Sequence, residues 1–228
     1  MALAKCSKTY FASALCLAAL LLSGCSAPTE PEEETAGSAL QINAVELEKQ
    51  LKEFVKDDSK ANVIADSQLR KSIPEAQAWI EGLEVSPSKC GVTFAAPVTE
   101  QLAKAKMAVV EFEDRYLTVA VYPDVEALQT QWESEAKASS DCARYSVTID
   151  GKTLAYHLAK QPTKTNAEFN DAYVVTSSDG SHTQQQLMVR AARGNVMVGF
   201  QQQTTADQTQ EQLKRASERI DALFAELE

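Results

Sequence analysis

Apolar residues recur at intervals of three and four over the last part of the chain, from about Asp207 to Leu227. The positions that share this stripe are Leu213, Ala216, Ile220, Leu223, Phe224 and Leu227. The spacing predicts an amphipathic helix. It is also compatible with a coiled-coil seam, but the segment is only a few turns long, which favours packing against a sheet of the same domain.

Helical spacing also occurs in the first half of the chain. The segment from Ala44 to Val55 predicts a helix, with Asn43 as its N-cap. Asp66 to Arg70 has the composition of a short capped turn, and Pro74 suits the first turn of a separate helix. Trp79 falls on the apolar face of that helix, so we expect it in the core.

The remaining apolar residues alternate with polar ones, which is the period of a β-strand. Seven such segments span residues 107–112, 116–122, 145–149, 153–159, 172–176, 184–192 and 196–201. Asp150-Gly151 joins two of them and is a strong hairpin signal. Pro123 ends the second strand, and a helix with Trp132 on its apolar side follows to about Ala138, before the third strand. Consecutive hairpins pair antiparallel, so the pattern predicts an α+β fold: an antiparallel β-sheet of about five to seven strands with flanking helices and a C-terminal helix.

A leader-like segment precedes this domain. Lys5 and Lys8 are followed by a run rich in Ala and Leu, from Phe11 to Leu22, which is well short of the roughly 20 apolar residues of a transmembrane helix. The run ends in Leu22-Ser23-Gly24-Cys25, where an aliphatic residue and two small residues precede a cysteine.

This segment resembles the signal peptide of bacterial prolipoproteins. The resemblance implies that residues 1–24 are removed and that the thiol of Cys25 carries a diacylglycerol, with palmitate among the acyl chains. The mature protein would then be lipid-anchored at the extracytoplasmic face of the cell membrane. The alternative is an ordinary secretory signal, which would release a soluble protein.

Composition divides the mature chain into a tether and one domain. Residues 25–40 lack large apolar side chains over most of their length and contain two prolines and the run Glu32-Glu33-Glu34, which predicts a disordered acidic tether. Residues 41–228 form the single α+β domain. The formal net charge is −10, and loss of two leader lysines makes it about −12, which argues against nucleic acid as a partner. The expected partners are the membrane, through the lipid anchor, and an envelope ligand or protein.

The chain has five cysteines. Cys6 and Cys16 leave with the leader and Cys25 is acylated, so Cys90 and Cys142 remain. An even pair in an oxidising compartment predicts a disulfide. A metal site would need more ligands, and a catalytic thiol would need an unpaired cysteine with a nearby histidine.

The sequence contains no Gly-rich nucleotide motif, no H-E-x-x-H zinc motif, no G-x-S-x-G elbow and no EF-hand loop. The two histidines, His157 and His182, fall in a predicted strand and a predicted turn and are interpreted as structural. Arg190 and the glutamines 201–203 are interpreted as solvated sheet positions. The sequence therefore predicts neither an enzyme nor a cofactor or metal site.

A one-sided antiparallel sheet with helices against it can leave a concave face. The aromatic residues proposed to line such a cleft are Tyr122, Trp132 and Tyr156, each of which also suits the core. Tyr116 and Tyr173 are further candidates of the same kind.

The order of features across residues 40–228 resembles the extracellular sensor domain of actinobacterial receptor Ser/Thr kinases and its free-standing lipoprotein relatives. The features are a Pro-containing loop before Cys90-Gly91, the strand ending Val121-Tyr122-Pro123, the helix with Trp132, and Cys142. The resemblance implies an α+β domain with a central antiparallel sheet and a ligand cleft, and no catalytic residues. Domains of that family carry two disulfides, whereas this chain has cysteines for one.

Two functions follow as hypotheses. The first is a non-catalytic ligand-binding or sensor domain of the cell envelope, which predicts a polar or aromatic-lined cleft. The alternative is an adaptor lipoprotein without a small-molecule ligand, which predicts a filled interior and an exposed apolar patch, for example on the helix at 207–227. An envelope hydrolase is disfavoured by the missing motifs.

Overall fold

The computed structural model describes residues 39–90 and 103–227, which belong to one compact unit, Ala36–Glu228. The predicted leader, the predicted lipidation site Cys25 and nearly all of the predicted tether lie outside the described residues. Among those that are described, no helix is both long and apolar enough to cross a bilayer.

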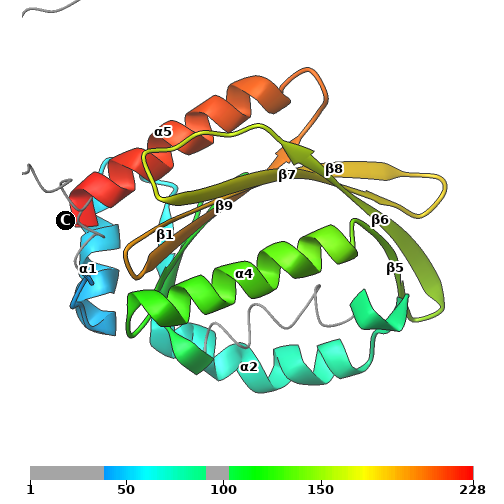
Figure 1. The fold of residues 1–228 in the computed structure, drawn as a ribbon, viewed down its shortest axis with the longest axis horizontal. Helices are drawn as coiled ribbons and strands as arrows, with labels where there is room; N and C mark the ends of the chain where they lie inside the picture. Colours follow the sequence, from blue (N-terminus) through cyan, green and yellow to red (C-terminus); the bar gives the residue numbers. More distant parts are fainter. Residues whose placement is uncertain (1–38, 91–102, 228) are drawn as a thin grey trace, which may run out of the picture. The chain divides into compact units, whose positions relative to one another are not determined.

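Four α-helices, a 3₁₀ turn and nine strands make up the described residues (Figure 1). The helical elements are α1 (Ala44–Phe54), α2 (Asp66–Glu81), η1 (Ser88–Cys90), α4 (Val125–Asp141) and α5 (Thr209–Leu227). The strands are β1 (Asn62–Ile64), β2 (Glu84–Ser86), β3 (Lys106–Glu111), β4 (Arg115–Val121), β5 (Arg144–Ile149), β6 (Lys152–Gln161), β7 (Phe169–Ser178), β8 (Thr183–Arg193) and β9 (Val196–Thr204).

All nine strands join one antiparallel sheet in the order β1-β3-β4-β9-β8-β7-β6-β5-β2. The predicted α+β class and the antiparallel pairing are confirmed. The sheet exceeds the predicted five to seven strands by its two edges, β1 and β2, which are three residues long. A segment this short cannot show an alternating pattern. Such a segment forms a strand only by pairing with a neighbouring strand. In β1 Val63 lies opposite Val110, and in β2 Val85 lies opposite Val147.

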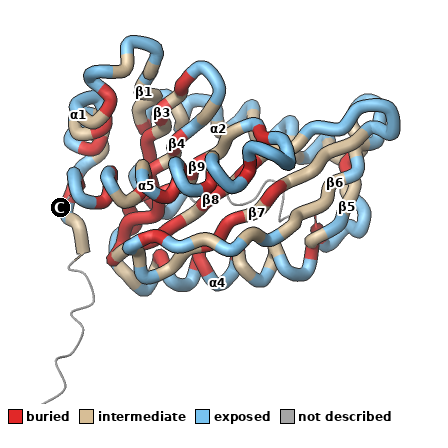
Figure 2. Tube along the Cα trace, turned by 90° about the horizontal axis from the view of Figure 1, so that it is seen from above, coloured by how far each residue is buried: buried red, intermediate tan, exposed pale blue. Residues whose placement is uncertain are grey.

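Helices cover both faces of the sheet, in agreement with the predicted flanking helices. Figure 1 shows α5 above the sheet and α4 and α2 below it. The larger core lies on the α5 side, where Leu47 and Leu51 of α1 pack with Leu117 of β4 and Ile220 of α5. Figure 2 shows these buried residues, in red, concentrated along α1, β3, β4, β9, β8 and α5, while the β5–β6 end is mostly intermediate or exposed.

A smaller core lies on the α4 side. Leu128 and Trp132 of α4 pack there with Tyr122, and Trp132 also contacts the ring of Phe169 at 5.8 Å between centroids. Strand alternation sets this division: Leu117, which packs in the larger core, and Tyr122 lie at positions of opposite parity.

Two predictions about α2 are wrong. The helix runs without interruption from Asp66 through Pro74 to Glu81, so Pro74 does not start a second helix. Trp79 is 50% exposed and does not belong to the core. Leu69 and Ile73, nearer the start of the helix, are the residues that pack against the smaller core.

Two local predictions are confirmed. Asp150 and Gly151 both have positive φ, 48° and 74°, which suits the two-residue turn between β5 and β6. Cys90 and Cys142 form the predicted disulfide, which joins η1 to the residue directly after α4. The bond therefore fixes the end of α4 beside the β2 edge.

The turn between β8 and β9 also holds the start of the domain. Asn195 is 1% exposed. Its Nδ2 donates to the carbonyl oxygens of Leu40 (3.1 Å) and Tyr122 (2.7 Å), and its Oδ1 accepts from the backbone N–H of Leu40 (2.7 Å). One side chain thus connects residue 40, the end of β4 and the start of β9.

Candidate functional site

A pocket of about 340 Å³ lies between α4 and strands β6 and β7. One wall comes from α4 and the residue beyond its cap: Trp132, Ala136, Ser139, Ser140 and Ala143. The other comes from the sheet: Leu158, Lys160, Asn170, Asp171 and Tyr173. Apolar and hydrogen-bonding side chains therefore face the same space, as in small-molecule sites.

The sheet wall follows from strand register. Lys160 on β6 lies directly opposite Tyr173 on β7, and Asp171, two residues from Tyr173, lies opposite Arg190 on β8. Because side chains alternate between the faces of a strand, these residues share the face that α4 covers.

Arg190 is the centre of a buried ionic cluster beside the pocket. Its Nε and Nη2 donate to Asp171 Oδ1 (3.0 Å) and Oδ2 (2.7 Å), and its Nη1 donates to Glu135 Oε2. Glu135 Oε1 also accepts from Gln131 Nε2 at 2.7 Å. The side chains of Arg190, Asp171 and Glu135 are 15%, 6% and 6% exposed. The interpretation of Arg190 as a solvated sheet residue is therefore wrong.

The environment of Arg190 stabilises its charge. Burial lowers the pKa of Arg190, but the hydrogen bonds and charge of Asp171 and the charge of Glu135 outweigh burial and hold that pKa above its usual value. The guanidinium also lies over the indole of Trp132, 5.0 Å from the ring centroid. Trp132 thus has Arg190 on one ring face and forms part of the pocket wall.

Two tyrosines border the ionic cluster. Burial, followed by the negative charge of Asp171, raises the pKa of Tyr173, which keeps the hydroxyl protonated as a donor. Tyr122 is 2% exposed, and its hydroxyl has no hydrogen-bond partner among the residues that the structure describes. Burial, followed by the negative charge of Glu135, raises the pKa of Tyr122 far above its usual value.

The structure does not bring the three predicted cleft residues together. Trp132 lines the pocket. Tyr122 lies in the smaller core and is not part of the lining. Tyr156 stacks on Tyr145 of the neighbouring strand, with ring centroids 5.0 Å apart and planes 4° apart, and is not part of the lining. Tyr173, one of the two further candidates, lines the pocket, whereas Tyr116 does not. The rest of the sheet wall consists of residues such as Lys160 and Asp171, whose strand positions look ordinary in the sequence.

A larger hollow, about 670 Å³, lies between α1, β1 and the start of α2. Its lining includes Glu48, Lys52 and Lys56. Lys52 already pairs with Glu48 at 2.6 Å, and Lys56 pairs with Glu53, at the protein surface. This hollow is therefore a surface groove whose lysines are already paired, and its lining contains no buried ionic cluster like that of Arg190.

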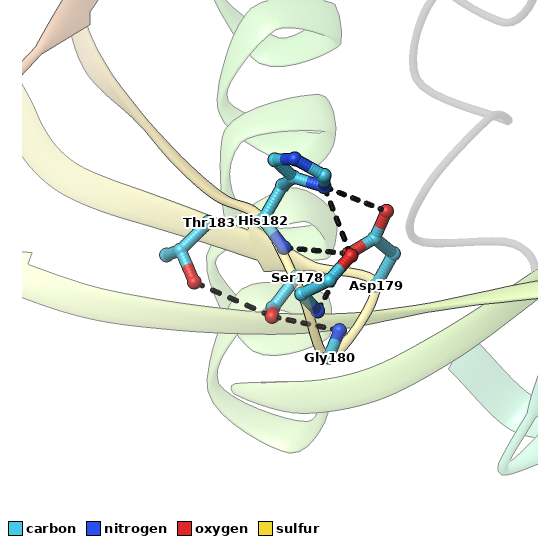
Figure 3. Close-up of polar contacts among 6 residues, drawn as sticks. Ser178, Asp179, Gly180, His182 and Thr183 are labelled. Atoms are coloured by element: carbon cyan, nitrogen blue, oxygen red, sulfur yellow. Dashed lines mark hydrogen bonds and ion pairs between the residues drawn. The ribbon is translucent and has the colours of Figure 1, made fainter.

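The turn between β7 and β8 brings a serine, a histidine and an aspartate together (Figure 3). Asp179 Oδ1 accepts from the backbone N–H groups of Ser181 (2.8 Å) and His182 (2.7 Å) and from Ser181 Oγ (2.8 Å). These bonds lower the pKa of Asp179 to about 2.

This arrangement differs from a hydrolase triad. Ser181 Oγ and Asp179 Oδ2 both approach Nδ1 of His182, at 2.9 and 3.6 Å, whereas a triad places serine and carboxylate on opposite ring nitrogens. The His182 side chain is 84% exposed. The three residues therefore stabilise a surface turn. His157 lies on the other face of the sheet from Leu158, away from the pocket, and no group of three metal-ligating side chains occurs within residues 39–90 and 103–227.

Comparison with known proteins gives structural neighbours only. No family model matches the sequence, and no curated protein matches it. The extracellular domain of PknH from Mycobacterium tuberculosis is similar in structure, with a TM-score of 0.46 and 12% identity over 82% of this chain and 93% of that one. The Rv0999 ortholog from Mycobacterium smegmatis, an uncharacterized protein, has a TM-score of 0.35 and 14% identity over 64% of this chain and 77% of that one.

Proposed function

We propose that this protein is a lipoprotein anchored through Cys25 to the extracytoplasmic face of the cell membrane. Its folded domain is a non-catalytic module that binds a small ligand in the pocket between α4, β6 and β7. The observation that carries the proposal is the convergence of hydroxyl, amide, ammonium and carboxylate groups in a 340 Å³ pocket backed by the buried Arg190 cluster.

Stability alone does not explain a buried ionic cluster, because apolar residues of the same volume often stabilise a fold as well or better. Here the cluster holds Asp171 in one orientation at the pocket wall. Fixed polar groups on rigid strands and a rigid helix are what a specific binding site requires. This favours a binding role for the pocket over a purely structural one.

The adaptor alternative is less well supported. It predicts an exposed apolar patch on the C-terminal helix, but the apolar stripe of α5, including Leu213, Ile220 and Leu223, is buried against the sheet. The large apolar side chains that are exposed in the described residues are Val45, Trp79 and Tyr116, on three different elements. These residues form no patch on α5.

A blocking substitution tests ligand binding. Ala136 lines the pocket, and Ala136→Trp would fill it, whereas Lys137→Trp adds the same side chain at the neighbouring exposed position of α4. The melting temperature of each full-length protein is measured in detergent with a panel of sugars, sugar phosphates, amino acids, amines and nucleotides. Stabilisation of the wild type and of Lys137→Trp, but not of Ala136→Trp, supports the proposal. A panel without any stabilising compound contradicts it.

The anchor needs its own test. Cells are grown with an alkyne analogue of palmitate and fractionated. We expect the wild-type protein to carry the label and to sediment with membranes, and Cys25→Ala to lose both properties. Labelled Cys25→Ala protein would contradict lipidation at this residue.

A further inference from the structure

We propose that the pocket takes a neutral, hydroxyl-rich ligand, such as a sugar or polyol unit. The inference rests on the proposed function, since it assigns the ligand class of the same pocket. It follows from three properties of the walls: their charge, their hydrogen-bonding groups and their apolar surface.

The charges around the pocket cancel. Asp171 and Glu135 each accept from Arg190, and the fourth charge, Lys160, lies at the exposed rim. An anionic ligand would face Asp171 and the C-terminal end of α4, whose carbonyl groups carry partial negative charge. A cationic ligand would face Lys160 and would compete with Arg190 for Asp171. A neutral ligand meets neither repulsion.

The polar groups of the walls suit hydroxyl groups, which both donate and accept. Ser139, Ser140 and Tyr173 offer hydroxyls, Asn170 offers both halves of an amide, and Lys160 offers N–H donors. Asp171 receives two bonds from Arg190 and one from the Tyr173 hydroxyl, and because a carboxylate has about four acceptor sites, it can still accept from a ligand hydroxyl. Arg190 fixes the direction of those lone pairs, so a ligand hydroxyl meets an acceptor that is already oriented.

Apolar surface completes the match. Trp132, Ala136, Ala143 and Leu158 face the same space as the polar groups. A sugar ring presents C–H groups on its faces and hydroxyls around its edge, so it needs both kinds of wall at once. The volume of about 340 Å³ is at the small end of ligand pockets, which fits one or two such rings.

The chain provides its own reporter. It has two tryptophans, Trp79 and Trp132. Trp79→Phe, at a half-exposed position, leaves Trp132 in the pocket wall as the sole indole. Fluorescence of this full-length variant is titrated with neutral hexoses, disaccharides and inositols, and each hit is compared with its phosphorylated and amino-substituted counterpart.

We expect saturable change with at least one neutral compound and at least tenfold weaker binding of both charged counterparts. Tyr173→Phe removes one hydroxyl from the wall and is expected to weaken the hit about fivefold, the effect of one hydrogen bond. Ser146→Ala, on the opposite face of β5 from Tyr145, is the control and should leave affinity unchanged.

The outcomes separate the two proposals. If phosphorylated or amino compounds bind more tightly than neutral ones, the neutral-ligand inference is wrong and ligand binding stands. If neutral compounds bind but still raise the melting temperature of Ala136→Trp, they bind outside this pocket and the inference is also wrong. If no compound of any charge binds, both proposals fail.

Discussion

Arg190 and Asp171 lie directly opposite one another on neighbouring strands, and the guanidinium donates two nearly parallel hydrogen bonds to the carboxylate. This bidentate geometry is the strongest form of an arginine–carboxylate pair. Glu135 extends the pair to α4, so one side chain on β8 connects β7 and the helix. Arg190 therefore connects the α4 wall of the pocket to its β7 wall.

Replacing Arg190 tests this connection. Arg190→Met leaves two buried carboxylates without their shared cation, and we expect a loss of about 3–5 kcal/mol in the free energy of unfolding. Arg215→Met removes an arginine from an exposed pair with Glu211 on α5 and should cost less than about 1 kcal/mol. Urea denaturation followed by circular dichroism measures both. Equal losses would show that the buried cluster is no more important than a surface pair.

The disulfide closes a loop of 52 residues between Cys90 and Cys142. The chain-entropy model gives about 4 kcal/mol for a loop of this length. The double replacement Cys90→Ser with Cys142→Ser should therefore lower the free energy of unfolding by roughly that amount. The same denaturation experiment with reduced wild-type protein is the control and should give a similar loss. An unchanged midpoint would contradict the expectation.

Two glycines provide a matched pair of backbone tests. Gly151→Ala places a side chain at φ 74° in the β5–β6 turn and should cost about 1–2 kcal/mol. Gly199 lies within β9, and a Cβ there would meet the Cβ of Thr118 at 3.8 Å, which is ordinary contact. Gly199→Ala should change the free energy of unfolding by less than about 1 kcal/mol. A larger loss at Gly199 than at Gly151 would contradict this ranking.

We predict that the contribution of the β7–β8 turn to folding stability is lost in acid. The folded pKa of Asp179 is about 2, below the usual value near 3.9, so its contribution to stability is present above pH 4 and is lost as pH falls through 2. Nuclear magnetic resonance of the Asp179 carboxyl carbon should give a midpoint near 2, and the amides of Ser181 and His182 should shift with it. A midpoint near 4 would mean that the hydrogen bonds of the turn are absent in solution.

The sequence predicts most of this fold because most elements carry their own local signal. Asn43 caps α1 as expected, with its side chain accepting from the N–H groups of Val45 and Glu46. The Asp150-Gly151 turn and the apolar stripe of α5 are likewise encoded locally. Each of these features depends on residues that are close together in the chain, so the local sequence pattern is enough to predict it.

The errors occur where a residue's environment comes from distant segments. Arg190 looks like a solvated strand residue in the sequence, but register places Asp171 opposite it and α4 places Glu135 in contact with it. Trp79 fits an apolar helical stripe, but the end of α2 where it lies is not packed against either core cluster. The pocket was not predictable as a set, since its residues come from α4, β6 and β7 and share no motif.

The hydrogen bonds of Asn195 determine where a force on the tether would enter the folded domain. If Cys25 anchors the chain as proposed, any pull between membrane and domain travels along the polypeptide to Leu40, where Asn195 holds both backbone groups of that residue. The same amide donates to the carbonyl oxygen of Tyr122, so the load passes into β9 and β4, two interior strands of the sheet. Strands β6 and β7 and the end of α4 lie off this path. The ligand pocket would then keep its shape while the tether is under tension.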